Sequence, residues 1–251
     1  MVLANRSEAI KTLRVMGLPV HVGVNYADWL LAQYRAGVGS HVVTLNAEMA
    51  MQADHNPTLR QIIAGADLVI PDGAGVVLYF QAKGKRVDRT PGIELSAQVL
   101  QRLAPQETAF FYGGAPGITD HAALYWQRKS PGIQIVGTQH GFLSPEDQPA
   151  FLQRLETLQP SVIFVGLGVP RQELWIRDHR HLCPNSVWIG VGGSFDIWAG
   201  VKNRAPEWMC KHHLEWLYRL YQEPWRWRRM LALPQFALRS LTYVQRPYAQ
   251  R

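Results

Sequence analysis

The chain has 251 residues, of which 47% are hydrophobic and 18% are charged, a composition that is typical of a globular protein and excludes a disordered chain. It has no run of 18 apolar residues and no long apolar stretch near its start, and its only cysteines are Cys183 and Cys210. These features argue against a membrane-spanning helix, a secretory signal and a disulfide framework, and they favour a protein of the reducing cytoplasm.

The net charge of +7 lies entirely in the last fifth of the chain. Residues 1–201 contain 16 Lys/Arg and 16 Asp/Glu, whereas residues 202–251 contain 10 Lys/Arg, 3 Asp/Glu and four of the nine tryptophans. We therefore predict an α/β domain over residues 1–201 and a basic, aromatic-rich C-terminal appendage over residues 202–251. A charge asymmetry of this kind indicates an anionic partner.

Six short runs in the first part are predicted as strands. They are nearly continuous in apolar residues, as is typical of strands that are buried on both faces of a parallel sheet. The runs cover residues 41–45, 66–70, 108–112, 133–137, 161–165 and 186–190.

Amphipathic segments of helical length separate these runs. In the clearest, residues 148–155, Phe151 and Leu155 share one face, and the helix start is predicted at Ser144 as N-cap with Pro145 as the first helical residue. Because strand and helix alternate several times, we predict a Rossmann-like, doubly wound, mostly parallel sheet.

Beyond residue 202, the stretch LEWLYRLYQEPWRWRRM at 214–230 combines cations with large aromatic residues. One apolar helix face is predicted from the spacing of Leu214, Leu217, Tyr218 and Tyr221. Pro224 should stop or kink this helix. After it, tryptophan alternates with arginine, which suits a membrane interface, so Trp225, Trp227, Arg228 and Arg239 are predicted to face anionic lipid. An ordinary amphipathic helix with a solvated basic face remains the alternative.

The turns after the predicted strands are the candidate binding segments, because ligands of such sheets bind beyond the carboxyl ends of the strands. They are polar and rich in glycine: TLN at 44–46, PDGAG at 71–75, GGAPG at 113–117, GLGVPRQE at 166–173 and GGSFD at 192–196. Pro-Asp-Gly is also a common turn sequence. Gly113 and Gly114 could offer amides to phosphate, or could serve tight packing alone.

Other motifs exclude some functions. Arg171 stands where a dinucleotide fingerprint would have its third glycine, so neither a nicotinamide nor a flavin cofactor is expected, and an epimerase or dehydrogenase is disfavoured. The histidines lack ligand spacing and there is no Asp-x-Asp, so no metal site is predicted.

Taken in order, these segments resemble the WecG/TagA/CpsF glycosyltransferase family over roughly residues 18 to 235. The most specific parts are GLGVPRQE at 166–173, RAPEW at 204–208 and LEWLYRL at 214–220. The resemblance implies a glycosyltransferase of cell-surface polysaccharide synthesis whose reaction inverts the anomeric centre and needs no metal. The transferred unit is a hexose or N-acetylhexosamine, with N-acetylmannosamine favoured. It passes from a UDP-sugar to a sugar linked to polyprenyl diphosphate. The resemblance also implies peripheral attachment to an anionic membrane surface on the cytoplasmic side and no cofactor, and it allows a homo-oligomer.

The resemblance also assigns site residues. It places the catalytic base on Asp72, with Thr44 and Asn46 beside it. Donor and diphosphate binding falls on Arg89, Gln172, Asp196, Arg219, Arg226 and Arg229, to which we add Gly113 and Gly114 from their sequence alone. Elementary chemistry agrees, because an inverting transfer needs one carboxylate to take a proton and cations to hold the departing diphosphate.

The chain departs from the family pattern at three positions. Phe142 replaces a frequent tyrosine, Arg171 a frequent lysine and His213 a usual glycine. The first two bear on the identity of the donor more than on the type of reaction. The alternative function is a non-enzymatic sugar-nucleotide sensor with a basic, nucleic-acid-binding tail. Against it, no nucleic-acid-binding module is recognisable and residues 1–201 are neutral, so nucleic acid is not expected as a partner.

Overall fold

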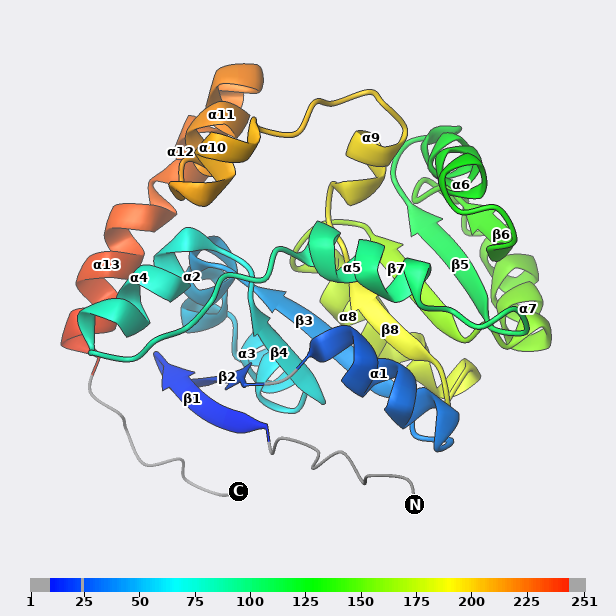
Figure 1. Ribbon diagram of the computed structural model, residues 1–251, viewed down its shortest axis with the longest axis horizontal. Helices are drawn as coiled ribbons and strands as arrows, with labels where there is room; N and C mark the ends of the chain where they lie inside the picture. Colours follow the sequence, from blue (N-terminus) through cyan, green and yellow to red (C-terminus); the bar gives the residue numbers. More distant parts are fainter. Residues whose placement is uncertain (1–9, 24, 244–251) are drawn as a thin grey trace, which may run out of the picture.

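A six-stranded parallel sheet forms the centre of the molecule. The computed structural model describes residues 10–23 and 25–243. The strand order is β4-β3-β8-β7-β5-β6 and every pairing is parallel. Helices cover both faces (Figure 1), so the predicted α/β class with a Rossmann-like parallel sheet is confirmed. The strands are β3 (Ser40–Leu45), β4 (Leu68–Pro71), β5 (Thr108–Gly113), β6 (Gln134–Gln139), β7 (Val162–Gly166) and β8 (Val187–Gly190).

A separate antiparallel hairpin precedes the sheet and was not expected from the sequence. It consists of β1 (Lys11–Val15) and β2 (Leu18–Val22). Its two-residue turn places Met16 at φ 49 and Gly17 at φ 77. Such turns are usually recognised by Asn-Gly or Asp-Gly, and a methionine in the first position gives no such signal.

The helices begin where the sequence provides caps. Asn25, Asn46 and Asn56 each accept a side-chain hydrogen bond from the backbone N–H three residues further on, which satisfies one free donor of the first turn. The helical elements up to residue 198 are α1 (Tyr26–Arg35), α2 (Ala47–His55), α3 (Pro57–Ala64), α4 (Ala74–Ala82), α5 (Gly92–Gln101), α6 (Ile118–Lys129), α7 (Gln148–Leu158), α8 (Arg171–His179), η1 (Arg180–Leu182) and α9 (Ser194–Trp198).

The predicted start of α7 is wrong by three residues. The hydroxyl of Ser144 accepts a hydrogen bond from the Asp147 amide at 3.1 Å, as an N-cap would, but residues 145–147 form a turn and the helix begins only at Gln148. The same side-chain chemistry stabilises caps and isolated turns, so the sequence does not distinguish between them.

Alternate strand residues point to opposite faces and build two cores. On one face, Phe111 and Phe164 pack with residues of α1, α5, α6 and α9. On the other, Val43 packs with α2, α3 and α4, while Phe110 packs with α7 and α8. Burial on both faces explains why five of the strands read as continuous apolar runs. The prediction is wrong for β6, which lies at the edge of the sheet and has no buried residue.

The C-terminal part is helical and returns to the core. Its elements are α10 (Glu207–Lys211), α11 (Glu215–Gln222), η2 (Pro224–Arg226), α12 (Trp227–Met230) and α13 (Ala232–Thr242). The helix α11 ends two residues before Pro224, as predicted. Its apolar face is not buried, however: Leu217 is 43% and Tyr221 81% exposed, and the buried residue of α11 is Glu215.

The last helix, α13, packs beside α2 and α4 (Figure 1). Its Phe236 is only 2% exposed and belongs to the core that also contains residues of α2 and α4. The boundary between residues 201 and 202 stays a prediction, and a chain that ended there would lose this buried ring. None of the described helices is long and apolar enough to span a bilayer.

Candidate active site

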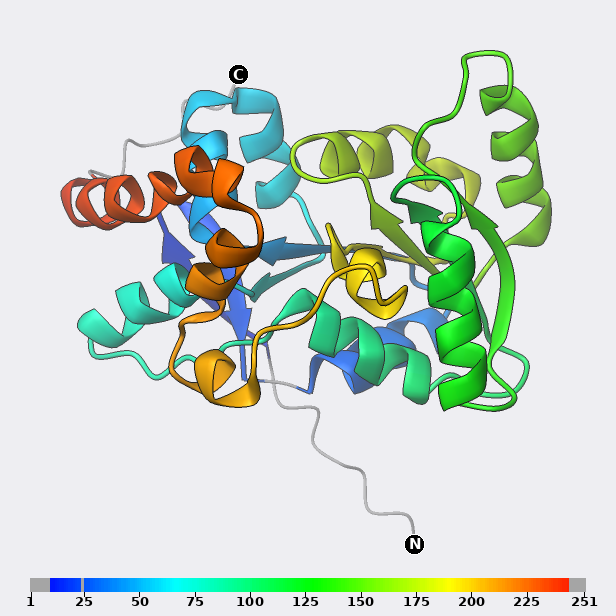
Figure 2. The ribbon, with the colours of Figure 1, turned by 90° about the horizontal axis from the view of Figure 1, so that it is seen from above.

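Two cavities meet at the carboxyl ends of the central strands. The larger, of about 400 Å³, lies over the turns that follow β3, β7 and β8, and the smaller, of about 120 Å³, lies between the turns after β3 and β4 and the helices α11 to α13. Figure 2, seen from above, shows the orange appendage helices between α13 and α9. The residues that line both cavities are Asn46, Glu48, Asp72, Glu215, Arg219, Arg226 and Arg229.

Asp72 lies at the junction of the two cavities. Its Oδ1 accepts a hydrogen bond from the Gly92 amide at 2.9 Å, and the Asp72 amide donates to the carbonyl of Leu45 at 3.0 Å. Burial raises the pKa of the Asp72 carboxyl, while the Arg219 charge and the Gly92 amide oppose this shift. The carboxyl group is therefore fixed in position and more basic than an aspartate on the surface.

Glycines allow the strand ends to approach one another around Asp72. A Cβ on Gly73 would lie 2.6 Å from Cβ of Asn46, and one on Gly92 would lie 2.8 Å from Cγ2 of Thr44. The sequence predicted Thr44, Asn46 and Asp72 as one group, and the structure brings all three to the wall of the larger cavity.

Two of these side chains already hold hydrogen bonds. Asn46 caps α2 by accepting from the Met49 amide at 3.0 Å, so its side-chain NH₂ remains available to a ligand. Thr44 donates its hydroxyl proton to the carbonyl of Gly190 at 3.2 Å, so it faces the cavity as an acceptor.

The three predicted arginines of the appendage lie together, and each is paired with a carboxylate. Arg219 bonds Glu215 within α11, and Arg226 reaches Glu223 at 2.6 Å. These pairs hold the guanidinium groups over the cavities. Arg229 pairs with Glu48 of α2 at 2.7 Å, and in this way α12 is attached to the helix that follows the carboxyl end of β3.

Arg89 lines only the smaller cavity. It approaches Glu215 at 3.1 Å, so that this single buried carboxylate holds both Arg89 and Arg219. The neighbouring arginines lower the pKa of Glu215 against the effect of its burial, so the group stays ionised at neutral pH.

Gln172 belongs to a buried chain of hydrogen bonds at the floor of the larger cavity. Its amide donates to Glu173 at 2.9 Å and its oxygen accepts from the Gly192 amide at 3.1 Å. Glu173 in turn approaches Nε2 of His41 at 2.8 Å, and both side chains are buried. The orientation of the Gln172 amide is therefore determined by its neighbours before any ligand binds.

Gly113, the last residue of β5, and Gly114 directly after it have a packing role. Gly113 adopts φ 132, and a Cβ there would lie 2.4 Å from the carbonyl oxygen of Gly166. The Gly114 amide donates to that same carbonyl at 3.1 Å. It does not offer the free N–H that we expected for a phosphate, although Gly114 lines the larger cavity.

Asp196, which was predicted to bind the donor, lines the larger cavity, and its carboxylate is already paired with a cation of the protein. Its Oδ2 accepts from Nζ of Lys202 at 2.9 Å, and the same ammonium lies 3.2 Å from Glu223. Lys202 was not singled out from the sequence, although it stands at the predicted boundary of the appendage.

Arg204 was also missed as a site residue, although it opens the RAPEW segment that supports the resemblance. It pairs with Glu94 of α5 and lines the larger cavity. The Nε atoms of Arg204 and Arg226 are buried and have no hydrogen-bond partner among the described residues. Two unsatisfied donors on cationic groups beside one cavity fit a polyanionic ligand.

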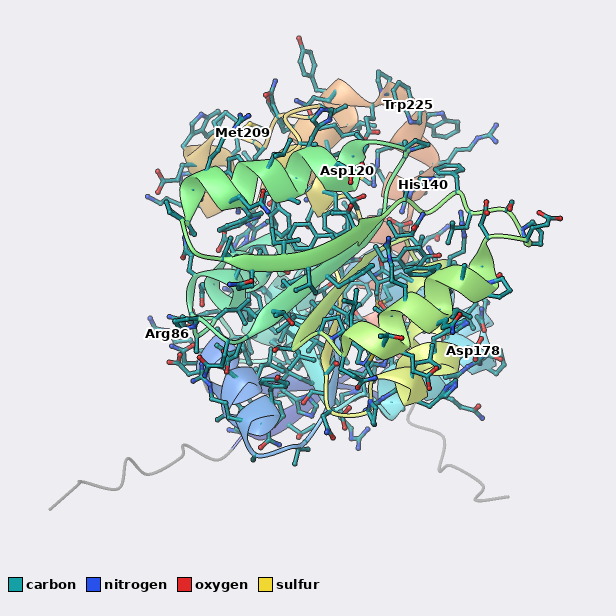
Figure 3. All side chains as sticks on the ribbon, turned by 90° about the vertical axis from the view of Figure 1, so that its right-hand side faces the viewer. Arg86, Asp120, His140, Asp178, Met209 and Trp225 are labelled. Carbon is teal, nitrogen blue, oxygen red and sulfur yellow. The ribbon has the colours of Figure 1, made fainter. Side chains whose placement is uncertain are left out.

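The predicted membrane residues lie on the outer side of the appendage, with one exception. Trp225 is 70% and Trp227 53% exposed, and Arg228 stacks on the ring of Trp227 at 5.5 Å. Figure 3 shows Trp225 projecting from the outer surface. Arg239 instead pairs with Asp54 at 2.7 Å, so its charge is already matched within the protein.

Two further points concern the sequence predictions. Phe142 is 68% exposed on the loop after β6 and does not line either cavity. Within residues 10–23 and 25–243, no three His, Cys, Asp or Glu side chains gather in a way that could hold a metal ion.

Known proteins resemble this chain over most of its length. Residues 13–250 match the family model described as "Glycosyl transferase WecG/TagA/CpsF family". An N-acetylglucosaminyldiphosphoundecaprenol N-acetyl-beta-D-mannosaminyltransferase of Bacillus spizizenii (strain ATCC 23059 / NRRL B-14472 / W23) is 37% identical over 207 residues, which cover 82% of this chain and 80% of that protein. A protein of the same name from Bacillus subtilis (strain 168) is 33% identical over 220 residues, covering 86% and 85%.

Proposed function

Because the chain belongs to the WecG/TagA/CpsF family of glycosyltransferases, we propose that it transfers N-acetylmannosamine from a UDP-sugar to N-acetylglucosamine carried on a polyprenyl diphosphate. The names of the two relatives state this sugar and this acceptor for those proteins. Because the family consists of enzymes, the alternative function, a non-enzymatic sugar-nucleotide sensor, is no longer supported.

One observation carries the proposal for this chain: Asp72 lies where the two cavities meet, with Arg219, Arg226 and Arg229 lining the same junction. A group-transfer enzyme must hold two substrates on either side of the reacting bond, with a base on the acceptor side and positive charge at the leaving group. The larger cavity has a volume typical of sites for ligands such as a nucleotide sugar.

In the proposed reaction, Asp72 takes the proton from the acceptor hydroxyl as that hydroxyl attacks the anomeric carbon. The Gly92 amide holds one carboxylate oxygen, which leaves the other for the acceptor. The raised pKa brings the base closer to neutral pH, and this improves proton transfer. Attack opposite to the bond that breaks inverts the anomeric centre.

The departing UDP carries the bonding electrons to its diphosphate, where negative charge grows. Arg204 and Arg226 each have a buried Nε without a partner among the described residues, and both line the larger cavity. Charge-assisted bonds from these groups to phosphate oxygens would stabilise the leaving group without a metal ion.

We also propose that the appendage lies on the membrane that carries the acceptor, at its cytoplasmic face. Support comes from exposed aromatic residues next to cations, a combination that suits the interface of an anionic bilayer. The most exposed large apolar residues of the appendage are Trp208, Tyr221, Trp225, Trp227, Leu238 and Leu241.

The proposed reaction is tested with purified protein, a set of UDP-sugars and a synthetic, water-soluble prenyl-diphosphate N-acetylglucosamine, with products read by mass spectrometry. We expect a product that contains N-acetylhexosamine from UDP-N-acetylmannosamine, formed equally well in the presence of EDTA. Transfer that stops with EDTA and returns with manganese would refute the arginine account of the leaving group.

A further inference from the structure

We propose that the smaller cavity receives the sugar of the acceptor, and that His213 selects this sugar. The proposal rests on the function proposed above, because it assigns the second substrate of that reaction to a place in the molecule. The sequence marked His213 as a departure from the usual glycine of the family but assigned it no role, and the structure places it in the wall of the smaller cavity.

The location of the smaller cavity favours the acceptor. It meets the larger cavity at Asp72, so a hydroxyl placed in it would reach the base from the side opposite to the donor. Its volume of about 120 Å³ is less than a third of that of the larger cavity, so the larger cavity is the better site for the nucleotide sugar and the smaller one is left for the acceptor.

The lining of the smaller cavity gives a second reason. Its wall combines polar groups at the junction with apolar residues of the appendage, among them Trp216, Met230 and Leu233. The indole of Trp216 can cover the apolar face of a sugar ring, as aromatic side chains supply apolar contact area of this kind. The same helices present Trp227 and Leu231 to solvent, so a lipid tail could leave the cavity on the side where the apolar surface begins.

The backbone of His213 is held in an unfavourable conformation. Its φ is 61, in the left-handed region that glycine adopts readily and that histidine, like asparagine and aspartate, enters more often than other side chains do. A loop that only had to connect α10 to α11 would be more stable with glycine at this position. This conformation ends α10, because the His213 amide donates to the carbonyl of Cys210 at 3.3 Å and the Leu214 amide to that of Met209 at 2.8 Å. Helix termination accounts for the backbone, so a role for His213 rests on the position of its side chain beside the cavity.

The imidazole of His213 has unused hydrogen-bonding capacity. It lines the smaller cavity, and its Nδ1 is buried without a partner among the residues that the structure describes. Burial lowers the pKa of His213, and the charges of Arg89 and His212 lower it further, so the ring is neutral at pH 7. A neutral imidazole offers one donor and one acceptor, which is what a sugar hydroxyl or acetamido group can bond.

The test compares His213→Gly with His212→Gly. The first substitution empties the cavity wall and relieves the strained backbone, so the protein should unfold at the same temperature as the wild type or higher. The second substitution places glycine at the neighbouring position 212, so the backbone of the same loop gains the same conformational freedom. His212 is exposed and lines neither cavity, so both cavities stay unchanged. Initial rates give the KM of donor and acceptor for each protein, and titration calorimetry gives the affinity for the soluble prenyl-diphosphate N-acetylglucosamine.

We expect His213→Gly to weaken acceptor binding about tenfold, the effect of one lost hydrogen bond, and to leave the KM of the UDP-sugar unchanged. It should also discriminate less between acceptors that carry N-acetylglucosamine and glucose. His212→Gly should behave as the wild type in every measurement.

Three results would overturn the proposal: unchanged acceptor affinity in His213→Gly, a rise in the KM of the donor instead, or equal losses in both variants. The calorimetry needs no turnover, so it separates this proposal from the proposed reaction. Binding that depends on His213 without transfer of sugar would contradict the reaction and leave the assignment of the cavity intact.

Discussion

Arg229 of α12 donates from Nε to Oε1 of Glu48 in α2 at 2.7 Å, and this contact joins the basic appendage to the helix that Asn46 caps. The two residues are 181 positions apart in the chain. Both line the junction of the two cavities, so the appendage forms part of the wall of each cavity.

Replacement of the proposed base should abolish turnover and spare the fold. We expect Asp72→Asn to lower the transfer rate at least about a hundredfold, the usual lower range for general-base catalysis, with UDP affinity close to that of the wild type. Rates are compared by mass spectrometry, and calorimetry with UDP serves as the control. Near-normal transfer by a folded Asp72→Asn protein would exclude Asp72 as the base.

Stability should depend on pH through the same residue. Burial raises the pKa of Asp72 in the folded protein above the ordinary value of 3.8, so folding disfavours its ionised form. The free energy of unfolding should therefore fall as pH rises from 3.8 through the folded-state pKa, and Asp72→Asn should lack this loss. Urea denaturation of both proteins at several pH values measures it. An identical pH dependence in the two proteins would contradict the raised pKa.

A carboxylate beside the proposed diphosphate site should weaken the binding of UDP. Glu223 pairs with Lys202 and Arg226, and the negative charge of UDP must compete with it for both cations. We expect Glu223→Gln to bind UDP roughly fivefold more tightly, since about 1 kcal/mol of repulsion between near-surface charges is removed. Calorimetry tests this at low and physiological salt. Weaker binding would mean that Glu223 acts mainly by positioning the cations.

Attachment to lipid should be separable from catalysis. The exposed rings of Trp225 and Trp227 are not in the cavity walls, so replacing both with alanine should reduce binding to anionic liposomes roughly tenfold and leave transfer to a soluble acceptor nearly unchanged. Co-sedimentation measures the first effect. The matched control replaces Leu124 and Tyr125, which are exposed on α6, and should bind liposomes as the wild type does.

The last helix should contribute strongly to stability. Phe236 is 2% exposed, so Phe236→Ala should cost roughly 3–5 kcal/mol of unfolding free energy, as expected for a large ring removed from a core. Leu238→Ala on the same helix is the control, because this side chain is 69% exposed and its loss should change stability by less than about 0.5 kcal/mol. Equal effects of the two substitutions would show that α13 is not part of the core.

Much of the fold could be predicted from short-range patterns. Six strands, their parallel arrangement and the end of α11 before Pro224 follow from apolar runs and turn residues, which act over a few positions. The hairpin with Met16 in its turn escaped prediction because its local signal is weak. The start of α7 was wrong because Ser144 can close a turn as well as cap a helix.

For the site, the sequence by itself determined which residue types follow the strands, and its resemblance to the family singled out Thr44, Asn46 and Asp72 among them. Only the tertiary structure decided which charges are matched. Arg239 is neutralised by Asp54, Lys202 bridges Asp196 and Glu223, and Glu215 holds two arginines. Several of these partners are distant in sequence, and an ion pair, unlike a helix or a strand, has no repeating sequence pattern from which it could be predicted. Their pairing arises only when packing of the apolar faces brings the appendage against the end of the sheet.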